Sequence, residues 1–343
     1  MRDEQNTPAS RVTLRDIAGE TGFSVNTVSH ALMNKEDISE KTRMLIQQRA
    51  REMGYIVDSV AGSMRSGSTR TIAVILGDVS NPHFGLWVRE IETVVFQCGY
   101  NTLIINTDED ESVEQGAVVA AISKRVDGII ICPTQKQNDC IGLLRKSGIP
   151  FVLIGRRWED LDTDYVVLDD VRGGYIATRN LMEQGADRIL FLNGPDHISS
   201  SRERLQGYLD AHKDTGYPVD HSIIRTVGIK SGECGKVLQE VVTQEIAFNG
   251  ILAFSDIVAF EILNELRKMG GQFARLPLAS FDDIMQGMAL PIPLDSIDSD
   301  EGPPSIAAAN LLMQHIKEKH RHDRHVPQQI VLKVKLVHRN FFE

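Results

Sequence analysis

One stretch near the N-terminus, TLRDIAGETGFSVNTVSHALM from Thr13 to Met33, has the pattern of two short helices joined by a tight turn. Thr13 can cap the first helix, with Asp16 at its third position, and Ser24 can cap the second. Gly22 lies between them, where a short connection needs a backbone free of side-chain constraint. The stretch therefore predicts a helix-turn-helix motif.

The second of these helices has an apolar side and an open side. Val28 and Ala31 are expected to pack inward at helical spacing. The expected outward positions are Val25, Asn26, Ser29 and His30. A helical hairpin within a larger all-helical domain would give the same pattern, so the stretch alone leaves that alternative open.

A third helix is expected to follow Ser39, which can cap it. Ile46, Ala50 and Met53 recur at helical spacing, and Gly54 can end the helix. Three short helices in roughly 50 residues would form a compact headpiece with a small core.

The 343-residue length exceeds that of one ordinary core, so several domains are expected. We expect a helix-turn-helix headpiece at residues 1–57, a Ser- and Gly-rich linker at 58–70 and a larger domain at 71–343. The sequence shows neither an apolar run of about 18 residues nor an apolar signal segment at its start. The cysteines lack CxxC spacing, which is typical of thiols in a reducing cytoplasm. These features predict a cytoplasmic protein.

The net charge of −10 does not by itself exclude DNA binding. Up to Arg70 the chain has ten Lys or Arg and nine Asp or Glu, a balance of +1, which leaves −11 for the remainder. A DNA-binding protein needs basic charge at the contact surface and not over its whole surface.

From Ile72 onward, short apolar runs alternate with helical patterns, which is the signature of parallel βαβ units. The expected strands are Ile72–Leu76, Asn101–Ile105, Gly128–Cys132, Phe151–Ile154, Val166–Leu168, Ile189–Leu192, Ile223–Val227, Gly250–Phe254 and Leu278–Phe281, with a closing strand at the C-terminus. The expected helices are Phe84–Gln97, Val113–Lys124, Gly173–Glu183, Glu203–Thr215 and Ile257–Lys268. The similar phrases VDGIII and FNGILA suggest equivalent strands in two halves of an α/β core.

Several motifs in order resemble the lactose repressor and galactose repressor (LacI/GalR) family of bacterial transcriptional regulators. In the headpiece they are TLRDIA, GFSVNTVS, ISEKTR and MGY. Farther along they are NPHF, VDGIII, R-x-x-G at Arg204, SD at Ser255 and SFDD at Ser280. The resemblance implies two doubly wound parallel-sheet lobes, like a periplasmic binding protein, behind an all-α headpiece. It also implies a dimer that binds a palindromic operator and represses carbohydrate-utilisation genes.

The resemblance and the chemistry of the side chains give candidate DNA contacts. Asn26 can pair with adenine and Val25 can touch a thymine methyl group. His30 stands where the family often has a guanine-reading arginine. Met64 stands where a leucine usually wedges into the minor groove, in a hinge that departs from the family pattern at Val57, Asp58 and Gly62. The full predicted set is Thr13, Ser24, Val25, Asn26, Thr27, Ser29, His30, Lys35, Arg43 and Met64.

Candidate effector residues follow the carboxyl ends of the expected strands, where doubly wound sheets bind ligands. They are Asp78, Asn81, Phe84, Arg156, Ser201, Arg204, Asp256 and Asp282. Carboxylates, guanidinium groups and an aromatic face suit a polyhydroxylated ring. Arg156 and Val227 stand where purine-binding members carry aromatic residues, which favours a sugar, sugar phosphate or polyol over a nucleobase. Inducer and corepressor remain equally open.

The sequence contains no nucleophile elbow, P-loop or HExxH motif, so neither an enzyme nor a cofactor is expected. The run HIKEKHRHDRH from His315 to His325 is interpreted as a solvated helix end and loop, with no metal site. Two alternatives stay open: a regulator controlled by a partner protein, and a solute-binding or sugar-acting protein with an accessory helical domain.

Overall fold

The computed structural model of this chain describes residues 12–56, 67–228, 232–270, 276–287, 294–321 and 323–339. The chain divides into two compact units, Met1–Thr69 and Arg70–Glu343. The predicted hinge contact Met64, and Val57, Asp58 and Gly62 around it, lie outside the described residues.

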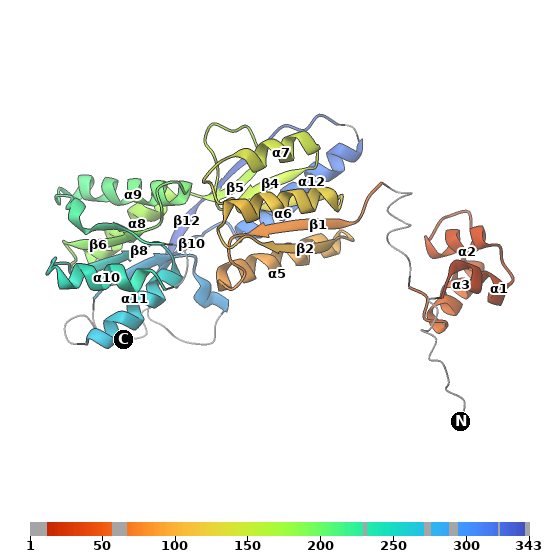
Figure 1. The fold of residues 1–343 in the computed structure, drawn as a ribbon, viewed down its shortest axis with the longest axis horizontal. Coiled ribbons are helices and arrows are strands. Elements are labelled where there is room, and N and C mark those ends of the chain that lie inside the picture. The colour runs from red at the N-terminus through yellow and green to blue at the C-terminus, as the bar shows by residue number, and fades with distance from the viewer. Residues whose placement is uncertain are drawn as a thin grey trace, which may run out of the picture. The chain divides into compact units, whose positions relative to one another are not determined.

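The described residues 12–56 of the first unit form three helices (Figure 1). Their N-terminal caps are those that the sequence predicts. The helices are α1 (Leu14–Thr21), α2 (Val25–Leu32) and α3 (Glu40–Glu52). Thr13 and Asp16 form a capping box, Ser24 caps α2, and Ser39 caps α3. Gly22 has a φ of +73°, the left-handed conformation that glycine adopts without strain. The core consists of buried Ile17, Val28, Ala31, Ile46 and Ala50.

The second unit consists of two lobes, each with a six-stranded sheet. The first sheet has the order β11-β5-β4-β3-β1-β2 and the second has the order β12-β10-β9-β8-β6-β7. The strands of the first sheet are β1 (Thr71–Leu76), β2 (Asn101–Asn106), β3 (Gly128–Ile131), β4 (Phe151–Ile154), β5 (Tyr165–Leu168) and β11 (Gln329–Leu332). Those of the second are β6 (Ile189–Asn193), β7 (Ile224–Thr226), β8 (Gly250–Ala253), β9 (Leu278–Phe281), β10 (Asp295–Ser299) and β12 (Val334–Val337).

Helices cover both faces of each sheet, as Figure 1 shows for both lobes. On the first sheet, α5 (Pro82–Gln97) and α12 (Pro304–Arg321) pack on one face, and α6 (Glu111–Ser123) and α7 (Asp139–Ser147) on the other. On the second, α8 (Asp170–Glu183) and α9 (Ser199–Thr215) lie opposite α10 (Cys234–Thr243) and α11 (Asp256–Met269). Two 3₁₀ turns, η1 (His221–Ile223) and η3 (Ile284–Gly287), complete the described elements. This confirms the predicted doubly wound architecture.

The two lobes repeat one strand order, and the predicted equivalence of VDGIII and FNGILA is confirmed. The first phrase contains β3, beside β1, and the second contains β8, beside β6. Both β3 and β8 begin with a glycine, because a side chain from a helix or loop packs directly on that residue. A Cβ at Gly128 would lie 2.9 Å from Ile316, and one at Gly250 would lie 2.6 Å from Ala186.

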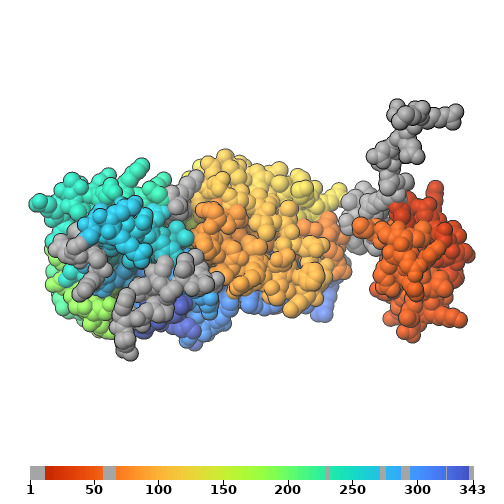
Figure 2. Space-filling view, turned by 90° about the horizontal axis from the view of Figure 1, so that it is seen from below, coloured from red at the N-terminus to blue at the C-terminus, as the bar shows by residue number. Residues whose placement is uncertain are grey.

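The C-terminal segment differs from the prediction of one closing strand. It forms two short strands, one in each sheet: β11 pairs parallel with β5, and β12 pairs antiparallel with β10. The sequence analysis also missed β10, α7 and α10, and of α12 it predicted only a helix end within His315–His325. The connections β5–α8, β10–α12 and β11–β12 pass from one lobe to the other, so the lobes are joined through three neighbouring segments. In the space-filling view these lobes lie directly against each other (Figure 2).

Within the described ranges, no helix is both long enough and apolar enough to cross a bilayer.

Candidate functional site

A cavity of about 350 Å³ lies at the carboxyl ends of the strands and takes its lining from both lobes. Its position is the one that doubly wound sheets give to ligands. The lining includes six of the predicted effector residues: Asp78, Asn81, Phe84, Arg156, Arg204 and Asp282. The lining residues outside the predicted effector set are Ser80, His83, Trp87, Asp108, Glu109, Cys132, Gly155, Leu168, Asp170, Ser200, Phe254, Ser255 and Pro304.

The first turns of α5 form an aromatic wall. Asn81 caps this helix by accepting from the His83 backbone N–H, and Phe84 and Trp87 follow at helical spacing. The Phe84 and Trp87 rings pack edge-on, with centroids 5.5 Å apart. Gly155, with a φ of +70°, gives Trp87 its room, because a Cβ there would lie 2.6 Å from the indole ring. The spacing from Phe84 was the available sequence signal for Trp87.

Arg156 forms a buried ion pair with Glu109 in the first lobe. Its Nη1 and Nη2 atoms each donate to a Glu109 carboxylate oxygen at 2.8 Å, and Nη1 also donates to the Pro133 carbonyl at 2.9 Å. Such a bidentate pair fixes the plane of the guanidinium group. Arg156 therefore lines the cavity as a hydrogen-bond donor whose positive charge is balanced by Glu109.

A second buried pair joins Arg204 to Asp170 in the second lobe. Arg204 Nε donates to Asp170 Oδ1 at 2.7 Å, and its Nη1 donates to the Phe254 carbonyl. The guanidinium carbon lies 4.0 Å from the Phe281 ring centroid and 4.7 Å from that of Phe254. Burial raises the pKa of the Asp170 carboxyl, and the charge of Arg204 opposes that rise.

The R-x-x-G spacing has a packing reason. Gly207 lies one turn after Arg204 on α9 and allows α9 to cross α8 at backbone contact distance. A Cβ at Gly207 would lie 2.0 Å from the Val171 carbonyl, and one at Gly174 would lie 2.3 Å from the Arg204 carbonyl. This close crossing fixes Arg204 beside Asp170.

Asp282 follows β9 with a φ of +100°, which residues other than glycine rarely adopt. Its backbone N–H donates to the Ile297 carbonyl at 3.0 Å. Among the described residues, none donates a hydrogen bond to its carboxylate, which lines the cavity. Strained residues cluster at ligand sites, so Asp282 is a candidate to accept from ligand hydroxyl groups.

The prediction that Asp256 contacts an effector is not matched by its position. Asp256 is completely buried and is not among the residues that line the cavity. Its Oδ1 accepts from the Ser280 and Ser296 hydroxyls, and its Oδ2 accepts from the Ile284 N–H at 2.9 Å. The carboxylate supports the turn that carries Asp282, because it accepts from Ser280 and from Ile284, two residues before and two residues after Asp282.

Burial, then the nearby charge of Asp282, raise the pKa of Asp256 to about 7, against the three hydrogen bonds that lower it. The folded state therefore keeps a proton that the unfolded state releases above its ordinary pKa of about 4. We expect the free energy of unfolding to fall by a few kcal/mol as the pH rises from about 4 to 7. Urea unfolding at several pH values across this range measures this change. In Asp256→Asn we expect the free energy of unfolding to depend less on pH. An unchanged slope in the variant would reject this assignment.

Ser201 also differs from its predicted place in the effector site. It is completely buried, and its Oγ lies against Gly194 instead of the cavity. The helix α9 begins at Ser199, earlier than the expected Glu203. Ser200 and Arg204, four residues apart on this longer helix, face the cavity instead.

Some of the predicted DNA contacts are exposed on helix α2, the candidate recognition helix, and others are not. Val25 is 41% exposed, and Asn26 is exposed beside it. Lys35 is exposed, whereas Arg43 is half-buried and donates to the Ile38 carbonyl at 3.3 Å. The hydroxyls of Thr13, Ser24 and Thr27 take part in capping contacts.

Ser29 is buried, so the prediction that it points outward is wrong. The reason is that α2 packs against both α1 and α3, which covers more of its circumference than one apolar stripe. His30 remains half-buried, and its Nδ1 lies 2.6 Å from an Asp37 carboxylate oxygen. The open surface of α2 is therefore narrower than its sequence indicated.

Comparisons with known proteins match both units. Residues 13–58 match the family described as "Bacterial regulatory proteins, lacI family". Residues 69–340 match "Periplasmic binding proteins and sugar binding domain of LacI family".

Individual relatives agree with this match. The "HTH-type transcriptional regulator DegA" of Bacillus subtilis is 33% identical over 260 residues, which cover 74% of this chain and 77% of the relative. The "HTH-type transcriptional repressor PurR" of Photobacterium profundum is 26% identical over 319 residues, covering 92% of this chain and 94% of the relative. The structure of the Lac repressor dimer bound to operator and the anti-inducer ONPF shares the fold, with a TM-score of 0.79 at 19% identity over 96% of this chain and 98% of that one.

The chain therefore belongs to the LacI family and is a DNA-binding transcriptional regulator that joins a helix-turn-helix headpiece to a periplasmic-binding-protein-like ligand domain.

Proposed function

We propose that this regulator is a repressor of carbohydrate-utilisation genes whose effector is an uncharged sugar or polyol. The cavity lining carries this proposal. Five carboxylates line it, against the two guanidinium groups of Arg156 and Arg204: Asp78, Asp108, Glu109, Asp170 and Asp282. A net negative lining disfavours sugar phosphates, because like charges brought together in a partly desolvated site repel each other.

The same lining suits the hydroxyl groups and apolar faces of a sugar ring. Carboxylates accept from pairs of adjacent hydroxyls, and the guanidinium hydrogens not used in the ion pairs can donate to others. The Trp87 and Phe84 rings, packed edge-on, offer an apolar wall to the C–H face of a pyranose or furanose. The family description of the matched region as a sugar-binding domain supports this choice.

A ligand screen on the full chain tests the proposed effector class. A micromolar ligand at millimolar concentration stabilises the folded state by about 4 kcal/mol, which is visible as a shift in Tm. We expect neutral sugars or polyols to raise the Tm, and sugar phosphates and nucleobases to leave it unchanged. A response to sugar phosphates or nucleobases alone would reject the uncharged-sugar proposal, and no response at all would favour control by a partner protein.

The two tryptophans provide a matched control for the site of binding. In Trp158→Phe the single remaining tryptophan is Trp87, so its fluorescence should report an effector directly. Trp87→Ala should lose the Tm shift. Repeating the titration with operator DNA present gives the sign of the coupling, because a ligand acts only through its different affinities for the two states.

We further propose that the chain acts as a homodimer on a palindromic operator. The edge strand β2 and the helices before and after it expose large apolar side chains: Phe96, Ile104, Val113 and Val119 are 70%, 46%, 44% and 49% exposed. An edge strand with exposed apolar residues is usually covered by a partner. We expect Ile104→Asp to sediment as a monomer and to bind operator much more weakly, whereas a dimeric variant would place the interface elsewhere.

The headpiece should show a shallow salt dependence of operator binding. The stretch from Ser24 to Leu32 contains neither Lys nor Arg, and Arg43 already contacts the Ile38 carbonyl. The slope of log K against log salt scales with the number of phosphates that basic groups neutralise. We expect a slope shallower than about −8 in a salt titration of the full chain. A steeper slope would mean that many more basic groups reach the phosphates.

A further inference from the structure

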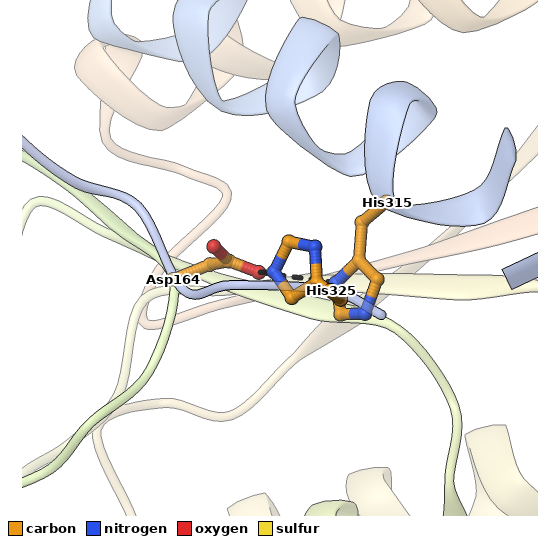
Figure 3. Close-up of side chains that lie close together, drawn as sticks. All are labelled: Asp164, His315 and His325. Carbon is orange, nitrogen blue, oxygen red and sulfur yellow. Dashed lines mark hydrogen bonds and ion pairs between the residues drawn. The ribbon is translucent and has the colours of Figure 1, made fainter. Parts of the chain in front are cut away.

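Two histidines and a buried aspartate meet at the end of the first lobe that is opposite the cavity. Asp164 immediately precedes β5, His315 lies on α12, and His325 lies in the segment between α12 and β11. Figure 3 shows the two imidazole rings side by side next to the Asp164 carboxylate. Because β5 and β11 begin here and run parallel, the cluster lies at the amino ends of the strands, whereas the cavity lies at their carboxyl ends.

The sequence interpretation of this histidine run as a solvated helix end is wrong for these two residues. The side chains of His315 and His325 are only 19% and 15% exposed, and that of Asp164 is 2% exposed. His320, in the same run, is exposed as that interpretation requires. Among the described histidines of the run, His315 and His325 therefore face one buried carboxylate, whereas His320 does not.

Both imidazoles lie within contact distance of the same carboxylate oxygen. His325 Nε2 is 2.7 Å from Asp164 Oδ2, and His315 Nδ1 is 3.0 Å from it. The second contact has the distance of an ion pair without the direction of a hydrogen bond, so His315 Nδ1 is a buried nitrogen without a hydrogen-bond partner among the described residues. Asp164 Oδ1 is held separately, by the Gln328 N–H at 2.7 Å. One oxygen of the carboxylate is thus anchored, and the other faces two ring nitrogens.

Glu318 fixes how His325 presents itself. His325 Nδ1 lies 2.7 Å from Glu318 Oε2. A neutral His325 that donates from Nδ1 has a lone pair on Nε2, and this lone pair points at a carboxylate oxygen. His325 Nε2 and Asp164 Oδ2 would then be two acceptor atoms 2.7 Å apart, which need a cation between them, either a proton or a metal ion. A carboxylate that orients a histidine through its other nitrogen is the usual outer support of a metal ligand.

We propose that Asp164, His315 and His325 form a binding site for a divalent transition-metal ion such as Zn²⁺. The ligand atoms are Asp164 Oδ2, His315 Nδ1 and His325 Nε2, and the candidate ligand atoms of the three residues all lie within 4.8 Å of one another. Two imidazoles and one carboxylate match the preference of Zn²⁺ for nitrogen and oxygen ligands, with water at a fourth position. Mg²⁺ and Ca²⁺ prefer all-oxygen sites, so the site should discriminate against them.

Metal binding requires a small local change. The two rings are stacked, with centroids 3.5 Å apart and planes at 8°. A ring nitrogen binds an ion that lies in the plane of its ring, and one ion cannot lie in two parallel ring planes. The ring of His315 must therefore turn until its Nδ1 lone pair points at an ion beside Asp164 Oδ2. This turn breaks no hydrogen bond at Nδ1 within the described part of the chain. The ion would then link the α12–β11 segment to the start of β5 and hold edge strand β11 in the first sheet.

The test is metal binding by the full chain after removal of metals with a chelator. Equilibrium dialysis against Zn²⁺ should give one bound ion per chain, and Co²⁺ should give the visible absorption of a four-coordinate site. His315→Gln and His325→Gln should each weaken binding at least about tenfold. The control His320→Gln, which removes an exposed histidine from the same run, should bind like the parent.

Thermal unfolding adds a readout that does not depend on counting ions. Zn²⁺ at roughly a hundredfold excess over its Kd should raise the Tm of the parent and of His320→Gln by roughly 5 °C, and should not raise that of His315→Gln or His325→Gln. A Cys98→Ser background removes the exposed thiol as a competing ligand. No bound Zn²⁺ in the parent, or an equal loss in His320→Gln, would overturn the proposal and leave a proton as the shared cation. His315→Gln keeps this test valid if His325→Gln fails to fold.

Discussion

Asn26→Ala is expected to remove most of the regulator's preference for its operator while leaving effector binding intact. Asn26 is exposed on α2, and its amide can pair bidentately with an adenine edge. Each such pair contributes about 1–3 kcal/mol of discrimination, so two copies in a dimer should contribute about 2–6 kcal/mol. Because about 1.4 kcal/mol is a factor of ten, the specific affinity should fall by at least about thirtyfold.

The measurement is a binding titration of specific and scrambled DNA at one salt concentration, with the effector Tm shift recorded in parallel. Gln48→Ala is a suitable control, because Gln48 is an exposed amide on α3 that lies outside the predicted contact set. It should change neither quantity. If Asn26→Ala lost the effector response together with operator preference, the assignment of the two functions to separate units would be wrong.

Arg204→Ala is expected to destabilise the second unit and abolish its effector response. Arg204 and Asp170 have side chains only 7% and 4% exposed, so the substitution leaves a buried carboxylate without its partner. Breaking a buried pair in this way costs about 3–5 kcal/mol. The same substitution removes a guanidinium group from the cavity lining and from the Phe281 and Phe254 ring faces.

A double variant separates the two effects. Arg204→Ala with Asp170→Ala removes both charges, so it should recover a large part of the lost stability and none of the effector response. Chemical unfolding gives the first quantity, and the effector-induced Tm shift gives the second. If the double variant showed the same Tm shift as the parent at the same effector concentration, this ion pair would support the fold and take no part in effector binding.

The local features of the headpiece could be predicted because they depend on residues close in the sequence. Thr13 and Asp16 form their capping box, Ser24 and Ser39 cap their helices, and Gly22 has the positive φ that its position demands. Each of these contacts spans three or four residues, so the sequence contains all the information they need.

Single-residue burial was less predictable, because it depends on which other elements pack nearby. Ser29 is buried since two helices flank α2, and Ser201 is buried since α9 starts four residues earlier than expected. Trp87 and Glu109 line the cavity without having been singled out, because their roles depend on Gly155 and Arg156 in the loop after β4. The short strand β10 was missed because its sequence, DSIDS, is not an apolar run. The C-terminal segment was not divided because nothing local shows that its two halves pair with strands of different sheets.

The sequence by itself determined the family, the helix-turn-helix headpiece, the parallel βαβ pattern and the edge of the sheets at which a ligand would lie. These follow from periodicity, caps and motif order along the chain. Only the tertiary structure decided that Asp256 supports the turn that carries Asp282, that Arg156 and Arg204 are paired with buried carboxylates, and that Asp164 meets His315 and His325. The physical reason is that charge pairing and burial act over a few ångströms in space, between residues that the chain separates by 24 to 161 positions.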